Sequence, residues 1–243
     1  MTASWVVIEE AARSSWPAAE VEALGGWRLR ASGGFTSRAN SVHVGTDVDP
    51  PDLDDRLAAV VAFYERRGLP PRLQVPLLHR GLLDDLRTRG WHVGGGADVL
   101  VGPIPSGGGD AVAISDRPEE LLDVWWAVNR AAAEHSIESA ALLRRIEAPV
   151  GFALARVDGH PVACGVGTVR DDLLGIAAMA TVPAARGQGV GRRIIGALSA
   201  WGAGEGASTC WLQVEADNAP AVALYTSLGL RRSYAYVYLE RSA

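Results

Sequence analysis

The sequence predicts an α/β protein built from two similar halves. Stretches with apolar residues at helical spacing alternate with shorter apolar or alternating runs, which is the pattern of helices packed against a sheet. Residues 102–109 are rich in glycine and proline and have the composition of a linker. We therefore predict one domain over residues 1–104 and a second over residues 105–243.

In the first half, glycines end each stretch of helical periodicity. Apolar residues recur at helical spacing before each of these glycines, with Asp52 as a helix cap, so helices are expected over residues 3–24, 53–67 and 82–89. Runs with strand character follow or separate them, at residues 27–31, 39–44, 73–75 and 97–101.

The second half restarts the alternation after the linker. Asp158-Gly159 is a hairpin dipeptide and joins two of the expected strands. The predicted strands cover residues 111–115, 151–157, 162–169, 173–182, 210–215 and 232–240. The predicted helices cover residues 116–133, 137–147, 191–202 and 219–228.

The two halves end alike, which suggests a duplication, with chance similarity as the alternative. A shift of 139 residues lays Leu73-Gln74-Val75 on Leu212-Gln213-Val214. The same shift lays the acids and prolines of residues 47–51 on residues 186–190, which contain glycine and arginine. Because proline lacks an N–H group and aspartate repels phosphate, the first copy would keep the scaffold without an anion site.

Composition excludes several function classes. The net charge of −5 argues against general binding to nucleic acid or anionic membranes. All 23 basic residues are arginine, which removes any chemistry that needs a lysine. Cys164 and Cys210 lie in apolar runs typical of buried thiols, and no metal-ligand spacing occurs, so no metal is expected. Without a signal pattern or a membrane-length apolar run, a cytoplasmic location is the expectation.

The stretch with the clearest chemistry is the glycine-rich loop that runs from Arg186 to Gly191 and is followed by Arg192-Arg193. Such a loop, placed between a strand and a helix, presents unpaired N–H groups at the positive end of the helix and favours a phosphate group. The lysine of a nucleotide-binding P-loop is missing, and the G-x-G-x-G spacing differs from the dinucleotide fingerprint. The alternative interpretation is a glycine-rich turn without a ligand.

These residues resemble the GCN5-related N-acetyltransferases. Arg186, Gly189 and Gly191 match the motif of that family at a strand-to-helix turn, and Asn218 with Tyr225 seven residues later matches a second motif. The resemblance covers about residues 110–243. The first half, through residues 33–41, is similar to the front half of two-domain members. The resemblance implies two tandem folds, each a mixed, mostly antiparallel twisted sheet flanked by helices, the first of them degenerate.

The resemblance further implies acetyl-CoA as co-substrate. The pantetheine arm would lie along the end of a strand and pair with backbone groups, and its pyrophosphate would lie on the glycine loop. The cofactor-binding residues implied in this way are Ala180, Thr181, Val182, Arg186, Gly187, Gln188, Gly189, Val190, Gly191, Arg192 and Asn218.

The resemblance also implies that Tyr225 is the general acid. In the implied reaction a primary amine attacks the thioester directly in a ternary complex, and a tyrosine within reach of the departing sulfur can stabilise and protonate it. Glu215 is the candidate general base, with Glu134, His135 or a water chain as alternatives. For each of these three residues, an ordinary solvated side chain is the other interpretation.

Three residues are candidates for acceptor binding: Trp125, Asn129 and Arg38. The expected partner is a small-molecule or peptide amine, with no nucleic acid and no membrane, and the protein is expected to be a monomer or a homodimer. Two alternatives stay open at this point. One is a non-catalytic acetyl-CoA sensor or regulatory module, and the other is an acyltransferase that uses a different short acyl-CoA.

Overall fold

The structure is a computed structural model that describes residues 4–107 and 112–241. Its strands form a single mixed sheet in the order β1-β2-β3-β4-β11-β5-β10-β9-β8-β7-β6. Only two neighbouring pairs are parallel, β3 with β4 and β9 with β10, and all others are antiparallel. Helices flank this sheet, so the predicted fold class is confirmed, with the strands of both halves joined in one sheet.

The elements of the first half follow the order expected from periodicity and glycine positions. They are α1 (Trp5–Ser15), β1 (Glu20–Leu24), β2 (Trp27–Ala31), β3 (Val42–His43), α2 (Leu53–Glu65), β4 (Arg72–Pro76), α3 (Arg80–Thr88) and β5 (His92–Pro103). A 3-10 turn, η1 (Ser37–Ala39), lies between β2 and β3.

The second half contributes the remaining strands and helices. They are β6 (Val112–Ser115), α4 (Glu119–Val128), α5 (Arg130–Glu134), α6 (Ser136–Arg144), β7 (Val150–Val157), β8 (His160–Arg170), β9 (Leu173–Thr181), α7 (Val190–Gly204), β10 (Thr209–Val214), α8 (Ala219–Ser227) and β11 (Arg231–Glu240). A 3-10 turn, η2 (Pro183–Ala185), joins β9 to the glycine loop. The predicted strand 111–115 begins at Ala111, which lies outside the described residues.

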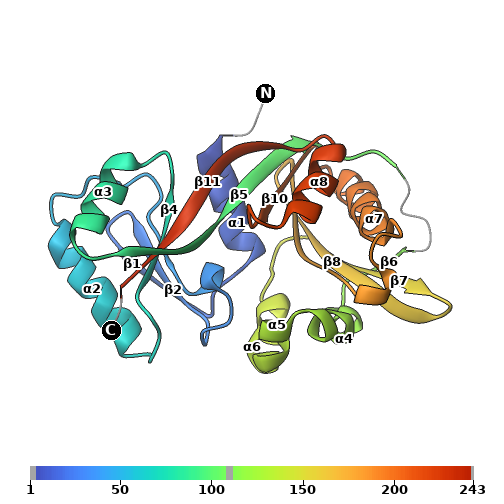
Figure 1. Ribbon diagram of the computed structural model, residues 1–243, viewed down its shortest axis with the longest axis horizontal. Coiled ribbons are helices and arrows are strands. Elements are labelled where there is room, and N and C mark those ends of the chain that lie inside the picture. Colours follow the sequence, from blue (N-terminus) through green and yellow to red (C-terminus); the bar gives the residue numbers. More distant parts are fainter. Residues whose placement is uncertain (1–3, 108–111, 242–243) are drawn as a thin grey trace.

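The two halves exchange their last strands. β5 belongs to the first half in sequence but lies between β10 and β11, and β11 belongs to the second half but lies between β4 and β5. Figure 1 shows β5 and β11 crossing the middle of the molecule, with α2 and α3 on one side and α4 to α8 on the other. Gly96 permits this crossing, because a Cβ atom there would lie 2.4 Å from the carbonyl oxygen of Tyr236.

The sheet order is nearly symmetric about the β5–β11 pair. The 139-residue shift lays α3 on α8 from end to end and lays the first residue of β5 on that of β11. It also lays the parallel pair β3–β4 near the parallel pair β9–β10. The similarity seen in a few letters therefore extends to the order and pairing of the elements.

Each half packs its helices against the sheet through buried apolar side chains. In the second half, alternate residues of β7 face opposite sides: Phe152 and Leu154 pack with α4 and α6, and Ala153 and Ala155 pack with α7. In the first half, α2 and α3 cover one face of β2 to β4. Helix α1 packs against the central strands, where Ile8 contacts a cluster that includes Trp211 and Tyr234.

Three sequence expectations in the first half were wrong. The helix predicted over residues 3–24 ends at Ser15, because Pro17 forces the chain out of the helix, and Glu20–Leu24 forms β1 instead. The strand predicted over residues 39–44 shrinks to Val42–His43, because the preceding residues form the turn η1. Asp52 precedes α2 but makes no capping hydrogen bond, since its carboxylate pairs with Arg56 at 2.8 Å.

One expectation in the second half was also wrong. The single helix predicted over residues 116–133 is two helices, because Asn129 leaves the helical conformation and its side chain caps α5 by accepting from the N–H of Ala132 at 3.0 Å. Across residues 4–107 and 112–241, no helix combines the length and apolar character needed to cross a bilayer.

Candidate active site

A pocket of about 440 Å³ opens where β9 and β10 separate. The two strands pair in parallel from Leu173 and Thr209 only as far as Ile176 and Leu212. From that point on, residues 176–179 of β9 and residues 213–215, at the end of β10 and directly after it, line the pocket. Backbone groups on a separated strand edge have no sheet partner there, so this opening can pair with an extended ligand.

A bulge in β9 lies on the pocket wall. Ala178 and Met179 lie opposite the single residue Gly165 of β8, and neither is paired with β10. Ala178 has a φ of +50°, an unusual backbone conformation for alanine. A Cβ atom on Gly165 would lie 2.6 Å from the sulfur of Met179, so a larger residue there would displace this side chain of the pocket wall. Sequence reasoning missed this feature, because alanine carries no signal for a positive φ.

Tyr225 enters the same pocket from α8. Its side chain is 7% exposed, and burial together with the neighbouring Cys210 raises the pKa of the phenol to about 12. The hydroxyl is therefore protonated throughout the neutral range and can act as a donor. Asn218 caps α8 by accepting from the N–H of Ala221 at 3.3 Å, and it also lines the pocket.

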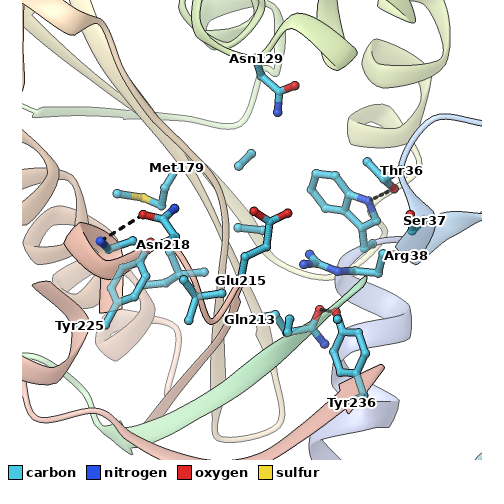
Figure 2. A pocket seen from close by; sticks show the side chains of 18 of the residues that line it. Thr36, Ser37, Arg38, Asn129, Met179, Gln213, Glu215, Asn218, Tyr225 and Tyr236 are labelled. Carbon is cyan, nitrogen blue, oxygen red and sulfur yellow. Dashed lines mark hydrogen bonds between the residues drawn. The ribbon is translucent and has the colours of Figure 1, made fainter. Parts of the chain in front are cut away.

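Glu215 follows β10 and lies on the pocket wall. Figure 2 shows its carboxylate between Tyr225 and Asn218 on one side and Arg38 on the other. The other two candidates for the base do not line the pocket. Glu134 is exposed and pairs with Arg130 at 2.7 Å, and His135 lies 6.2 Å from the ring of Phe35.

The glycine loop has the conformation expected of an anion site. Gly187 and Gly189 have φ values of +74° and +72°, and Gly189 is the N-cap of α7. The first turn of α7 contains no acid, so its free N–H groups face no negative side chain of that turn. In the described part of the chain, Arg186, Arg192 and Arg193 form no ion pair with a carboxylate.

The residues expected to pair with pantetheine lie beyond the bulge. Ala180 and Thr181 end β9 and are registered with Cys164 and Ala163 of β8. Val182 donates its N–H to the carbonyl of Val162 at 2.9 Å, so that N–H is already used within the chain. The strand segment that borders the pocket is 176–179, which sequence reasoning did not single out.

The first half supplies one end of the pocket through the loop from Ser32 to Asn40. Asn40 is buried and holds this loop: its Oδ1 accepts from the N–H groups of Ser32 and Gly34, at 2.7 and 3.1 Å. Its Nδ2 donates to the carbonyls of Phe35 and Thr36, at 2.7 and 2.8 Å.

The second half contributes Trp125 and Asn129 to the lining of the pocket. Trp125 lines the pocket and packs edge-on against Phe35 and Trp16, with centroids 5.7 and 6.0 Å away. The structure thus brings Arg38, Trp125 and Asn129 into one pocket with Glu215 and Tyr225. Pocket residues that sequence reasoning missed are Trp16, Thr36, Ser37, Gly96, Ala97, Ile176, Ala177, Ala178, Met179, Gln213, Val214, Ala221, Tyr236 and Tyr238.

The two cysteines are poor nucleophiles. Both are buried, and burial raises the pKa of each thiol to about 12, which leaves little thiolate at neutral pH. Among the described residues, no three His, Cys, Asp or Glu side chains gather closely enough to hold a metal ion.

Comparisons with known proteins agree with this geometry. A family model described as "Probable histone acetyltransferase Rv0428c C-terminal" matches residues 2–239. An "Uncharacterized N-acetyltransferase YobR" of Bacillus subtilis is 29% identical over 231 residues, which cover 91% of this chain and 92% of that protein. The "Probable histone acetyltransferase Rv0428c" of Mycobacterium tuberculosis is 29% identical over 242 residues, which cover 98% of this chain and 74% of that one.

Solved structures share the fold at low identity. A GCN5-related N-acetyltransferase from Kribbella flavida aligns with a TM-score of 0.68 and 18% identity, covering 93% of this chain and 90% of that chain. A tandem protein of the same fold from the clavulanic acid biosynthesis pathway aligns with a TM-score of 0.63 and 12% identity, covering 97% and 88% of the two chains.

Proposed function

This chain belongs to the family of the Rv0428c C-terminal acetyltransferases, within the GCN5-related N-acetyltransferases, and from that premise we propose how it binds its substrates and transfers the acyl group. It is an acyltransferase. The proposal names acetyl-CoA as the donor and a primary amine as the acceptor. The observation that carries it is the opening between β9 and β10, with the buried Tyr225 on its wall.

The proposed donor site runs from the glycine loop into this opening. The pyrophosphate would accept hydrogen bonds from the backbone between Gly187 and Arg192, at the positive end of α7. The pantetheine arm would lie between the separated strands, with its amides against the end of β9 and the side chain of Asn218. The absence of ion pairs on the loop arginines in the described chain supports this role, because their charges are available to phosphate.

The proposed reaction is a direct transfer. Glu215 takes a proton from the ammonium group of the acceptor, and the free amine attacks the thioester carbonyl. The bulge at Ala178 and Met179 offers a backbone N–H to the developing oxyanion. The bond between carbonyl carbon and sulfur then breaks, and Tyr225 donates its proton to the departing thiolate. The nitrogen loses its second proton as the amide forms, and this proton returns to Tyr225 or passes to solvent. The burial of Cys164 and Cys210 argues against an acyl-enzyme on either thiol.

The experiment that tests this function follows release of the thiol of coenzyme A by the full chain. Acetyl-CoA is offered with a panel of amines, amino acids, aminoglycosides and histone-like peptides, and acetylated products are identified by mass. Acceptor-dependent thiol release supports the proposal. Saturable acetyl-CoA binding without turnover of any acceptor would instead support a sensor or regulatory module. Faster turnover with propionyl- or succinyl-CoA would reassign the donor.

We also propose that the two halves of the chain arose by duplication of one ancestral domain. The near-symmetric order of the sheet supports this origin. Under the 139-residue shift, residues 47–51 replace the glycine loop in the first half. We propose that the first half, residues 1–104, has lost the donor site and now serves the acceptor end of the pocket.

A further inference from the structure

The pocket contains one charged side chain of each sign. Of the described residues that line it, Glu215 is the only acid and Arg38 is the only base. They come from different halves of the chain, and no ion pair within 4 Å joins them. A ligand that carries both an ammonium group and an anionic group would satisfy both side chains at once.

Arg38 is held in the pocket wall without an acidic partner. Its guanidinium lies 5.6 Å from the centroid of the Trp16 ring, and its Nε is buried without a hydrogen-bond partner. Burial lowers the pKa of Arg38, but the facing hydroxyls of Tyr236 and Tyr238 more than offset this, so the net shift is upward. In the described chain no carboxylate pairs with this guanidinium, so its charge is available to an anion in the pocket.

A second arginine, Arg30, lies behind the pocket wall, where it contacts the backbone of Trp16. Arg30 is 3% exposed, and its guanidinium donates to the carbonyl of Trp16 at 2.5 Å. Burial lowers the pKa of Arg30 to about 10, so it remains charged at neutral pH. In the described chain, Arg30 and Arg38 both lack an ion pair with a carboxylate. This end of the pocket therefore favours a negative group.

The loop that carries Arg38 is fixed in advance. Thr36, two residues before Arg38, has a φ of +57°, an uncommon conformation for threonine. Its hydroxyl accepts from the indole N–H of Trp16 at 2.9 Å, and the buried Asn40 bonds to its carbonyl. This arrangement limits the motion of Arg38 before a ligand binds, which lowers the entropic cost of binding.

We propose that the acceptor is a free amino acid, with its carboxylate bound by Arg38 and its amine beside Glu215. This inference rests on the proposed function. Figure 2 shows Glu215 between Arg38 on one side and Tyr225 with Asn218 on the other. In this pose the carboxylate lies at Arg38, the amine at Glu215 and the thioester near Tyr225, so the side chains must follow one another in this order. The amine nitrogen forms the new bond to the acetyl carbon, the carbon–sulfur bond breaks, and the products are an N-acetylamino acid and coenzyme A.

The test compares acceptors with and without a carboxylate. The full chain is assayed with acetyl-CoA and the common amino acids, β-alanine, and the corresponding amino acid amides. For the best acceptor we expect kcat/KM for the acid to exceed that for its amide roughly 10- to 100-fold, as for hydrogen bonds to a charged group. Arg38→Gln should bring this ratio close to one, and Arg38→Lys should leave an intermediate ratio.

Arg66→Gln is the matched control, because Arg66 is an exposed arginine of the first half that does not line the pocket. It should leave the ratio unchanged. Equal use of acid and amide by the unaltered protein overturns the inference, and so does a ratio that survives Arg38→Gln. If the Arg38 variants do not fold, the comparison with the unaltered protein decides alone.

Failure of this inference can be told apart from failure of the proposed function. If amides or histone-like peptides are acetylated and the carboxylate gives no advantage, the acyltransferase proposal stands and the amino acid proposal fails. If no amine of either kind releases coenzyme A, both fail.

Discussion

Replacing Tyr225 by phenylalanine removes one oxygen atom from the pocket wall and leaves the ring in place. The side chain is 7% exposed and packs in the core with Cys210 and Ile194, so the aromatic packing should survive. If Tyr225 assists departure of the thiolate, the variant should bind acetyl-CoA as before and turn it over more slowly.

The size of the effect on kcat depends on how close the pKa of the Tyr225 phenol is to the pKa of the coenzyme A thiol. Burial raises the pKa of Tyr225 to about 12. A solvated thiol has a pKa of about 8.5, so proton transfer to its thiolate would be uphill by roughly 5 kcal/mol. A buried thiol has a higher pKa than a solvated one. Burial raises the pKa of Cys210, a neighbour of Tyr225, to about 12. A desolvated coenzyme A thiolate would thus be nearly matched to Tyr225, and we expect Tyr225→Phe to lower kcat by about 10²- to 10⁴-fold.

The assay is thiol release at saturating acetyl-CoA, with binding measured separately by calorimetry. Tyr64→Phe is the control: Tyr64 is also buried and does not line the pocket. Its hydroxyl donates to the carbonyl of Arg30 at 2.9 Å, and the loss of this hydrogen bond should affect stability more than kcat. The raised pKa of Tyr225 also predicts that the protonated form persists, so kcat should show no alkaline loss near pH 10. A kcat within threefold of the unaltered protein would refute the role of Tyr225.

Three further predictions follow from the structure. Gly189→Asp places a carboxylate at the glycine loop and should raise the KM for acetyl-CoA roughly tenfold or more. The control is Gly206→Asp, which lies just beyond the other end of α7, is also at a positive φ, and should leave this KM unchanged. Glu9→Ala should destabilise the protein by about 3–5 kcal/mol, or lower Tm by roughly 6–20 °C, because buried Glu9 accepts hydrogen bonds from His43, Gln74 and Tyr234. Fragments 1–104 and 105–243 should each fail to fold alone but combine when co-expressed, because each lacks the strand that the other inserts into its sheet.

The glycine and fragment predictions each have an outcome that contradicts them. Equal acetyl-CoA KM values for the two glycine variants would remove the anion site from the loop. An isolated fragment 105–243 that melts cooperatively would show that β5 is dispensable.

The Glu9 prediction also has a pH dependence. Burial alone would raise the pKa of Glu9, but its hydrogen bonds to His43 and Tyr234 and its electrostatic interactions outweigh burial and hold this pKa below the ordinary value of 4.5. Its contribution is therefore full above about pH 4.5 and is lost as pH falls through the lower folded value. A Glu9→Ala variant whose stability falls as steeply below pH 4.5 as that of the unaltered protein would contradict this reasoning.

Local signals in the sequence predicted most of the elements correctly. Periodicity and glycine stops placed α2, α3, α7 and α8 within a few residues, because these helices end where glycine makes termination easy. The same signals failed at β1, where helical spacing over residues 3–24 obscured the break at Pro17. They also failed at Asn129, where a side-chain cap interrupts a helix without glycine or proline.

Less of the candidate site could be predicted, because its parts meet only in three dimensions. The glycine loop, Asn218 and Tyr225 lie close together in sequence and carry recognisable spacing. The bulge at Ala178 depends on register between strands, which leaves no mark in the residue types. The contributions of Trp16 and Tyr236 depend on the position of α1 and on the exchange of β5 and β11, and neither can be derived from periodicity.

The exchanged strands also determine when this protein can become active during its synthesis. β11 is the last described element to be translated, yet it lies in the middle of the sheet, next to β4 of the first half. Domains usually fold from the N-terminus as the chain emerges. Here a nascent chain that has reached Gly229 already contains the glycine loop and Tyr225 but lacks the strand that completes both halves. Translation that stops early would therefore yield products in which neither half is finished, so that only chains extending through β11 would have a complete pocket.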